Sequence, residues 1–196
     1  MSEVRAENTA VLTTPEQQRA LERFYHFEAR LLDNRQYQQW LALVSPDIQY
    51  SMPSRVNVQV DNRQSGRESM LAVEHELESA DSLGSPLREE TYIHLMLRVE
   101  RAFKINSWSE SPPARTRRIV ANIELMSEQG DELQVVSNFL LYYTRPGTQS
   151  VLYSGQRRDV LQLQQGDSTA DGYRIYRREV IMDYANIELP TLGLLF

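Results

Sequence analysis

The C-terminal part of the chain is dominated by strand-like alternation, and this feature limits the possible folds most strongly. Apolar residues recur at every second position from Ile119 to Leu125. Three further stretches with strand character follow after turn-forming residues, at 133–144, 151–163 and 173–182. Alternation over such lengths is typical of half-buried strands. Because the turns between these stretches are tight, we expect consecutive strands to pair antiparallel.

The N-terminal half has the periodicity of helices instead. Thr14, Pro15 and Gln17 form a helix start with a capping box, because threonine caps, proline suits the first turn and glutamine lies three residues after the cap. The apolar face that follows comprises Leu21, Phe24, Tyr25, Leu31 and Leu32. A second, short helix carries Tyr37, Trp40, Leu41 and Val44 on one side. Beyond strand-like segments at 48–52 and 56–60, we expect further helices at 69–80 and 89–103.

Helices followed by a run of long strands predict an α+β fold. We expect a cone-like, strongly curved antiparallel sheet that wraps around the N-terminal helices. The length of 196 residues fits a single domain over 1–196, with a flexible segment at 1–12.

Composition excludes several functional classes. The formal net charge of -6 argues against nucleic-acid binding, which needs a basic surface. The absence of cysteine excludes disulfides, cysteine-ligated zinc and ordinary iron–sulfur clusters. The three histidines, His26, His75 and His94, share no ligand spacing, so we expect neither a metal nor another cofactor in this chain. No apolar run approaches the roughly 20 residues of a membrane span, and no secretory signal is visible, which predicts a cytoplasmic protein without a membrane partner.

Glu28 is the most unusual carboxylate, because it falls on the apolar face of the first helix. In a cone with an open pocket it could transfer protons, with Tyr50, Tyr25 and His26 beside it. The alternative, which we favour, is that Glu28 pairs with a buried arginine.

Arginines are concentrated in the segment from Trp108 to Arg118. Arg115 and Arg117 share the parity of Ile119, so we expect them to point toward the core and to join an ion-pair cluster within the core or between subunits. An anionic ligand or a solvated strand end would also accommodate them. A role at a subunit interface or in structural ion pairs is likewise expected for Trp108, Arg118, Arg157, Arg158 and Phe196.

The end of the sequence is apolar from Leu189 to Phe196. Such a tail requires a groove, either on its own domain or on a partner.

These same segments resemble the small (beta) subunits of Rieske-type aromatic-ring-hydroxylating dioxygenases. The resemblance begins with Phe24-Tyr25-His26-Phe27-Glu28-Ala29-Arg30-Leu31-Leu32-Asp33, followed by Tyr37, Trp40, Asp47-Ile48-Gln49-Tyr50 and Met52-Pro53. It continues in Trp108-Ser109-Glu110 with Pro112-Pro113-Ala114-Arg115-Thr116-Arg117, in Gly155-Gln156-Arg157-Arg158-Asp159-Val160-Leu161, and in the tail that ends in Phe196. The pattern is most similar to the biphenyl, toluene, phenylpropionate and polycyclic-hydrocarbon branch. It departs from that branch at Ala114, where serine is more usual, and in the Glu-rich stretch at 74–78.

The resemblance implies a nuclear-transport-factor-like (SnoaL-like) cone and a non-catalytic, structural subunit. It implies a large (alpha) subunit that carries a Rieske 2Fe-2S cluster and a mononuclear iron, in a hexamer of three large and three small subunits. It also implies a ferredoxin and a reductase that deliver electrons from NADH, so that O2 converts an aromatic hydrocarbon to a cis-dihydrodiol. Two other hypotheses remain: a self-standing dehydratase or isomerase that uses Glu28 or Tyr50, and a module that binds ligands without chemistry.

Overall fold

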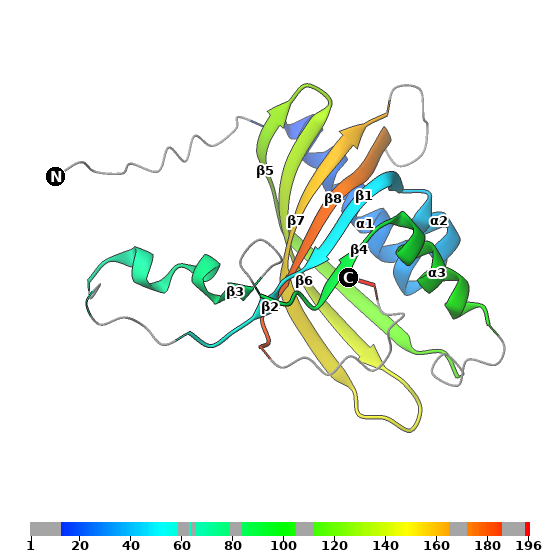
Figure 1. Ribbon diagram of the computed structural model, residues 1–196. Coiled ribbons are helices and arrows are strands. Elements are labelled where there is room, and N and C mark those ends of the chain that lie inside the picture. Colours follow the sequence, from blue (N-terminus) through cyan, green and yellow to red (C-terminus); the bar gives the residue numbers. More distant parts are fainter. Residues whose placement is uncertain are drawn as a thin grey trace.

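A six-stranded, strongly curved sheet forms the body of the protein (Figure 1). This computed structural model describes residues 13–58, 63, 66–78, 84–104, 112–164, 172–185 and 195–196, so the expected flexible segment 1–12 lies outside it. The strand order is β4-β1-β8-β7-β6-β5. The strands are β1 (Val44–Met52), β4 (Arg88–Glu90), β5 (Arg115–Gln129), β6 (Glu132–Thr144), β7 (Val151–Leu163) and β8 (Tyr173–Met182).

The four long C-terminal strands pair antiparallel in chain order, as their alternation and tight turns predict. The sheet is nevertheless mixed, because β1 pairs parallel with β8 and antiparallel with β4. The expected antiparallel sheet therefore contains one parallel pair, β1 with β8. The parallel pairing joins strands from opposite ends of the sequence, and no local turn signals it.

Three helices lie on the concave face of the sheet (Figure 1): α1 (Pro15–Asp33), α2 (Tyr37–Leu41) and α3 (Tyr92–Ala102). The start of α1 confirms the predicted cap, because the Thr14 hydroxyl accepts a hydrogen bond from the Gln17 amide N–H at 3.2 Å. The Gln17 side chain donates to Glu128 instead, which ties the first turn of the helix to β5. The α+β class and the cone-like arrangement are confirmed.

The segment between β1 and β4 differs most from the sequence prediction. Instead of a helix at 69–80, the described part holds two short 3-10 helices, η2 (Glu68–Leu71) and η3 (Val73–Glu76), followed by β3 (Leu77–Glu78). β3 pairs with β2 (Ser54–Arg55) to form a separate two-stranded ribbon. Neither 3-10 helix has a buried residue. Since helices in proteins depend on a packed apolar face, a longer helix has nothing to stabilise it here.

The core fills the space between α1 and the inner face of the sheet. Phe24 lies edge-on to Tyr173, at 5.8 Å between ring centroids. The end of the chain is part of this core: the Phe196 ring is buried, 5.7 Å from Tyr153 and 5.9 Å from Phe139. The predicted groove for the tail therefore lies on the chain's own fold for Leu195 and Phe196, while 189–194 lie outside the described residues.

Candidate functional site

A cluster of four charged side chains is buried at the centre of the cone. Glu28 comes from the inner face of α1, Arg157 and Asp159 from β7, and Arg178 from β8. Arg178 joins both carboxylates: its Nη2 lies 3.1 Å from Glu28 Oε2 and 2.8 Å from Asp159 Oδ2. Arg157 Nη1 lies 2.9 Å from Glu28 Oε2. Two carboxylates and two guanidinium groups make the cluster neutral, which is the condition for burying charges at tolerable cost.

Further groups contribute hydrogen bonds to the cluster, although Arg157 Nε is buried without a hydrogen-bond partner among the described residues. The Trp40 indole N–H donates to Glu28 Oε1 at 3.0 Å, and the Tyr25 hydroxyl donates to Asp159 Oδ2 at 2.8 Å. The main-chain oxygen of Phe196 accepts a hydrogen bond from Arg178 Nη1 at 3.3 Å. Helix, sheet and chain end therefore converge on one set of ions.

Electrostatics keep Glu28 ionised. Burial by itself raises the pKa of Glu28, but the charges of Arg178 and Arg157 outweigh it and lower the pKa from 4.5 to about 2. The same burial, reinforced by Asp159, raises the pKa of Tyr25 well above its usual value. Burial also raises the pKa of Tyr50.

These values disfavour proton transfer in the cone. A general acid or base at neutral pH needs a pKa near the working pH, whereas Glu28 holds no proton to donate and is a very weak base. Glu28 and Arg178 are also fully buried. The prediction that Glu28 pairs with a buried arginine is confirmed, and the dehydratase or isomerase hypothesis is not favoured.

A second buried ion pair fixes the end of α1 to the sheet. Asp33, the last residue of α1, accepts hydrogen bonds from the Arg118 backbone N–H at 2.8 Å and from Arg118 Nη1 at 2.6 Å. Thr116 donates to the same carboxylate at 3.0 Å. Arg118 Nη2 then donates to the Leu195 carbonyl at 2.6 Å, so the tail is held from this side as well.

The direction predicted for Arg115 and Arg117 was wrong. Both are exposed on the outer face of β5, and Arg118 points inward instead. The cause is a β-bulge between Ala121 and Glu124, where Asn122 adopts a positive φ of 50°. A bulge adds a residue to one strand and so reverses which alternate residues face inward. Ile119, before the bulge, therefore points outward, whereas Ile123, after it, points inward.

The other predicted residues lie in different surroundings. Arg157 and Phe196 belong to the buried cluster, whereas Arg158 points outward and pairs with Glu179 on the neighbouring β8 at 3.5 Å and with Glu74 at 3.3 Å. Trp108 lies outside the described residues. Their role at a subunit interface remains a prediction.

Arg178 was missed from the sequence, although a signal was present. It shares the parity of the buried Val180 and Met182 on β8. The pairing of β8 is irregular between Ile175 and Arg177, and this interrupts the alternation of buried and exposed residues. Arg178 is therefore buried although it does not share the parity of the buried Ile175.

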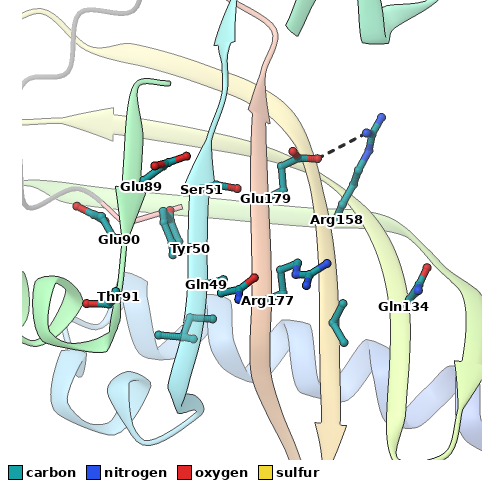
Figure 2. A pocket seen from close by; sticks show the side chains of 12 residues that line it. Gln49, Tyr50, Ser51, Glu89, Glu90, Thr91, Gln134, Arg158, Arg177 and Glu179 are labelled. Carbon is teal, nitrogen blue, oxygen red and sulfur yellow. Dashed lines mark ion pairs between the residues drawn. The ribbon is translucent and has the colours of Figure 1, made fainter. Parts of the chain in front are cut away.

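The outer face of the sheet carries a polar groove of about 830 Å³. Figure 2 shows it from outside, with Arg177 and Gln49 from adjacent strands and the ion pair between Arg158 and Glu179. Charges of both signs line it, with Glu89, Glu90 and Glu179 beside Arg158 and Arg177. Among the residues that the structure describes, no three His, Cys, Asp or Glu side chains are placed to hold a metal.

The outer face is apolar at its other end. Ile119 on β5, Leu140 and Tyr142 on β6 and Leu152 on β7 are all strongly exposed. Within the described ranges, no helix has the length and hydropathy that crossing a membrane would require. Paired ions in the interior and an exposed apolar sheet face define the class: an α+β cone whose described interior is held by ion pairs and whose outer face is suited to association.

Comparison with known proteins identifies the family. The family model described as "Ring hydroxylating beta subunit" matches residues 27–188, so the chain belongs to this family of subunits of aromatic-ring-hydroxylating dioxygenases. It is 29% identical to the beta subunit of benzene 1,2-dioxygenase from Pseudomonas putida, over 93% of this chain and 90% of the relative. It is 30% identical to the beta subunit of biphenyl 2,3-dioxygenase from Rhodococcus jostii, with the same coverage.

A solved structure shares the fold. A chain of naphthalene 1,2-dioxygenase with bound indole superposes with a TM-score of 0.74, covering 94% of this chain and 88% of that chain at 22% identity. The resemblance stated from the sequence motifs is thereby confirmed.

Proposed function

We propose that this chain is the non-catalytic structural small subunit of the terminal oxygenase in an aromatic-ring-hydroxylating dioxygenase. The observation that carries the proposal is the buried ion cluster in the cone, in which Glu28, Arg157, Asp159 and Arg178 are paired with one another and inaccessible to a substrate. Family membership supplies the assembly to which such a scaffold belongs.

The chemistry then lies with the partner. A large (alpha) subunit would carry the Rieske 2Fe-2S cluster and the mononuclear iron, with a ferredoxin and a reductase delivering two electrons from NADH. An arene, O2, NADH and a proton would give a cis-dihydrodiol and NAD+. This chain has no cysteine to hold such a cluster.

The substrate class follows from the names of the relatives. Benzene and biphenyl are unsubstituted aromatic hydrocarbons, and the two relatives that bear these names are matched over more than nine tenths of this chain. We propose an aromatic hydrocarbon as the substrate of the complex. The filled cone supports a role in which the small subunit holds the assembly together and the large subunit selects the substrate.

We further propose a hexamer of three large and three small subunits. Exposed apolar residues on the outer sheet face support a large protein contact, since such patches on soluble proteins mark interaction sites. Arg115 and Arg117 border that face and are proposed as interface residues, as are Arg158 and Trp108. Arg118, Arg157 and Phe196 act from the interior by keeping the sheet in shape.

Co-expression with the Rieske large subunit of the same source tests the proposal. Affinity purification through this chain, followed by light scattering, iron analysis and visible absorbance, should give a complex of equal stoichiometry with the iron confined to the large chain. A colourless small chain that purifies alone, with the large chain fully soluble without it, would refute the structural role. A cofactor-independent dehydratase or isomerase activity of the isolated chain would refute it as well.

A further inference from the structure

Positive side chains gather at the end of the molecule where α1 and α3 end and β5 begins (Figure 1). Residues 34–37, 100–117 and 144–148 contain six arginine or lysine residues against two glutamates, a formal net charge of +4, whereas the whole chain carries -6. The glutamates are Glu100 and Glu110, of which Glu110 lies outside the described residues. We call the surface formed by Phe103 and the six cations the basic end; the cations are Arg35, Arg101, Lys104, Arg115, Arg117 and Arg145.

Contacts between the segments of the basic end show that they adjoin in space. Arg35, just after α1, reaches the start of β5: its Nη2 and Nε lie 2.8 and 3.0 Å from the Ala114 carbonyl oxygen. Arg145, just after β6, places its Nε 3.0 Å from the Pro112 carbonyl oxygen. The segment that leads into β5 is therefore held between two arginines from different elements.

These hydrogen bonds orient the guanidinium groups without neutralising them, because a carbonyl oxygen carries no net charge. Asp33 is the carboxylate nearest in sequence to Arg35, but it is already paired with Arg118 at 2.6 Å. In the described part of the chain, no carboxylate pairs with Arg115 or Arg117. The C-terminal ends of α1 and α3 lie here as well, but each offsets only about half a charge. The basic end therefore keeps an excess of positive charge.

Arg35 has a backbone conformation that arginine rarely adopts. Its φ is 58°, in the left-handed region, where the residue that follows a helix is usually glycine or asparagine. Strained conformations persist where the surrounding structure requires them, and they are frequent at functional positions. At this position the side chain both holds Ala114 and remains exposed as part of the basic end.

An exposed aromatic ring lies beside the cations. Phe103, the residue after α3, is 54% exposed, and its ring lies edge-on to Tyr37 at 6.4 Å between ring centroids. Aromatic residues and arginines are enriched at protein interfaces. Since association requires complementary charges, a partner of this surface is expected to bring carboxylates around an apolar contact.

We propose that the basic end is the surface on which this chain binds the large subunit, with carboxylates of the large subunit facing Arg35, Lys104 and Arg115. The inference rests on the proposed function for the identity of the partner, and it adds the surface and the chemistry of the contact. Arg115 and Arg117 join it to the interface residues already proposed, and Arg35 keeps the start of β5 in position for the contact.

Lys104 provides a direct test, because it is the only lysine in the chain. The complex with the large subunit of the same source is treated with a water-soluble carbodiimide, which joins an amine to a carboxylate in direct contact with it. Peptides that contain Lys104 should be found joined to an aspartate or glutamate of the large subunit. Lys104→Arg keeps the charge and removes the amine, so the complex should form and these joined peptides should be absent.

Two results of the cross-linking would overturn the proposal. In one, Lys104 is joined only to carboxylates of small chains, in the same or a second copy. In the other, it is absent from every product that joins the two subunits. Both results are read from a complex that has formed, so they are distinct from a failure of the large subunit to bind, which would refute the proposed function instead.

Competition for the large subunit gives a second, independent readout. Wild-type and variant small chains with different tags are co-expressed with the large subunit, and their ratio in the purified complex is compared with their ratio in the soluble lysate. Arg115→Gln should be depleted roughly fivefold, because it removes one charged contact. Arg19→Gln, an exposed change near the start of α1, removes the same charge away from the basic end and should be incorporated equally.

Arg35→Gly separates binding from folding in the same assay. Glycine suits a φ of 58° better than arginine does, so the melting temperature of the isolated variant should stay close to that of wild type. Its share of the complex should nevertheless fall as that of Arg115→Gln does. Incorporation equal to wild type, whether or not the melting temperature changes, would remove Arg35 from the docking surface and overturn the proposal.

Discussion

Replacement of Glu28 with glutamine is expected to destabilise the protein strongly, although the change removes only a charge. Glutamine has nearly the same size and can still accept the hydrogen bond from Trp40. It cannot balance Arg157 and Arg178, so the buried cluster gains a net positive charge with only Asp159 to offset it. Removing one partner of a buried ion pair is costly for this reason.

Two estimates of the loss in the free energy of unfolding for Glu28→Gln agree. The lowering of the Glu28 pKa from 4.5 to about 2 means that its neutral form is less stable in the folded state by about 3 kcal/mol. Measured removals of one partner from a buried ion pair cost about 3–5 kcal/mol. For a chain of this length, a loss of about 3 kcal/mol lowers the melting temperature by roughly 6–12 °C.

The assay is urea denaturation of the purified chain, followed by circular dichroism, with wild type and Glu28→Gln side by side. Glu124→Gln, an isosteric change at an exposed position of β5, is the control and should alter the free energy of unfolding by less than about 0.5 kcal/mol. A loss below about 1 kcal/mol for Glu28→Gln would refute the argument, because it would mean that the four ions are not buried together in solution.

Three further predictions use the same instruments. Since the folded-state pKa of Glu28 is lowered, its stabilisation is present above about pH 4.5 and lost as the pH falls toward about 2; the stability difference between wild type and Glu28→Gln should therefore shrink between pH 6 and pH 3 in thermal melts, and a constant difference would contradict this. Arg118→Ala should cost about 3 kcal/mol in urea denaturation because it leaves a buried carboxylate unpaired, whereas Arg117→Ala should cost less than about 0.5 kcal/mol in the isolated chain; equal losses would contradict the assigned directions. Gly155→Ala should cost about 1–3 kcal/mol, since its Cβ would collide with the Ile181 carbonyl oxygen, and an unchanged melting temperature would show that the two strands can separate there.

Local signals in the sequence predicted the regular elements well. The cap at Thr14 placed the start of α1, and the last four strands begin and end within a few residues of the alternating stretches. These features depend on neighbours along the chain, so the sequence alone defines them. The buried partner of Glu28 was also foreseeable, because a carboxylate on an apolar helix face needs an opposite charge.

Features that depend on distant pairing were not predictable in the same way. The bulge at Asn122 reverses the parity of β5, and therefore exchanged the expected roles of Arg117 and Arg118. The segment around Val73 has helical composition, but no surface covers it, and it forms only 3-10 helices. In both places the local structure depends on the surface against which the segment packs. The periodicity of apolar residues along the sequence carries no information about that surface.

The buried ions also explain why a cone fold can serve as a scaffold. A fold does not determine function, which resides in the side chains placed on it. Here the inward positions of β7 and β8 carry Arg157, Asp159 and Arg178, where an enzyme with an open cone would need space and a titratable group near neutral pH. Buried ion pairs contribute little net stability compared with apolar packing, but they tolerate few alternative arrangements. The cluster joins α1, two strands and Phe196 through directional hydrogen bonds, so it holds the helix and the end of the described chain against the inner face of the sheet.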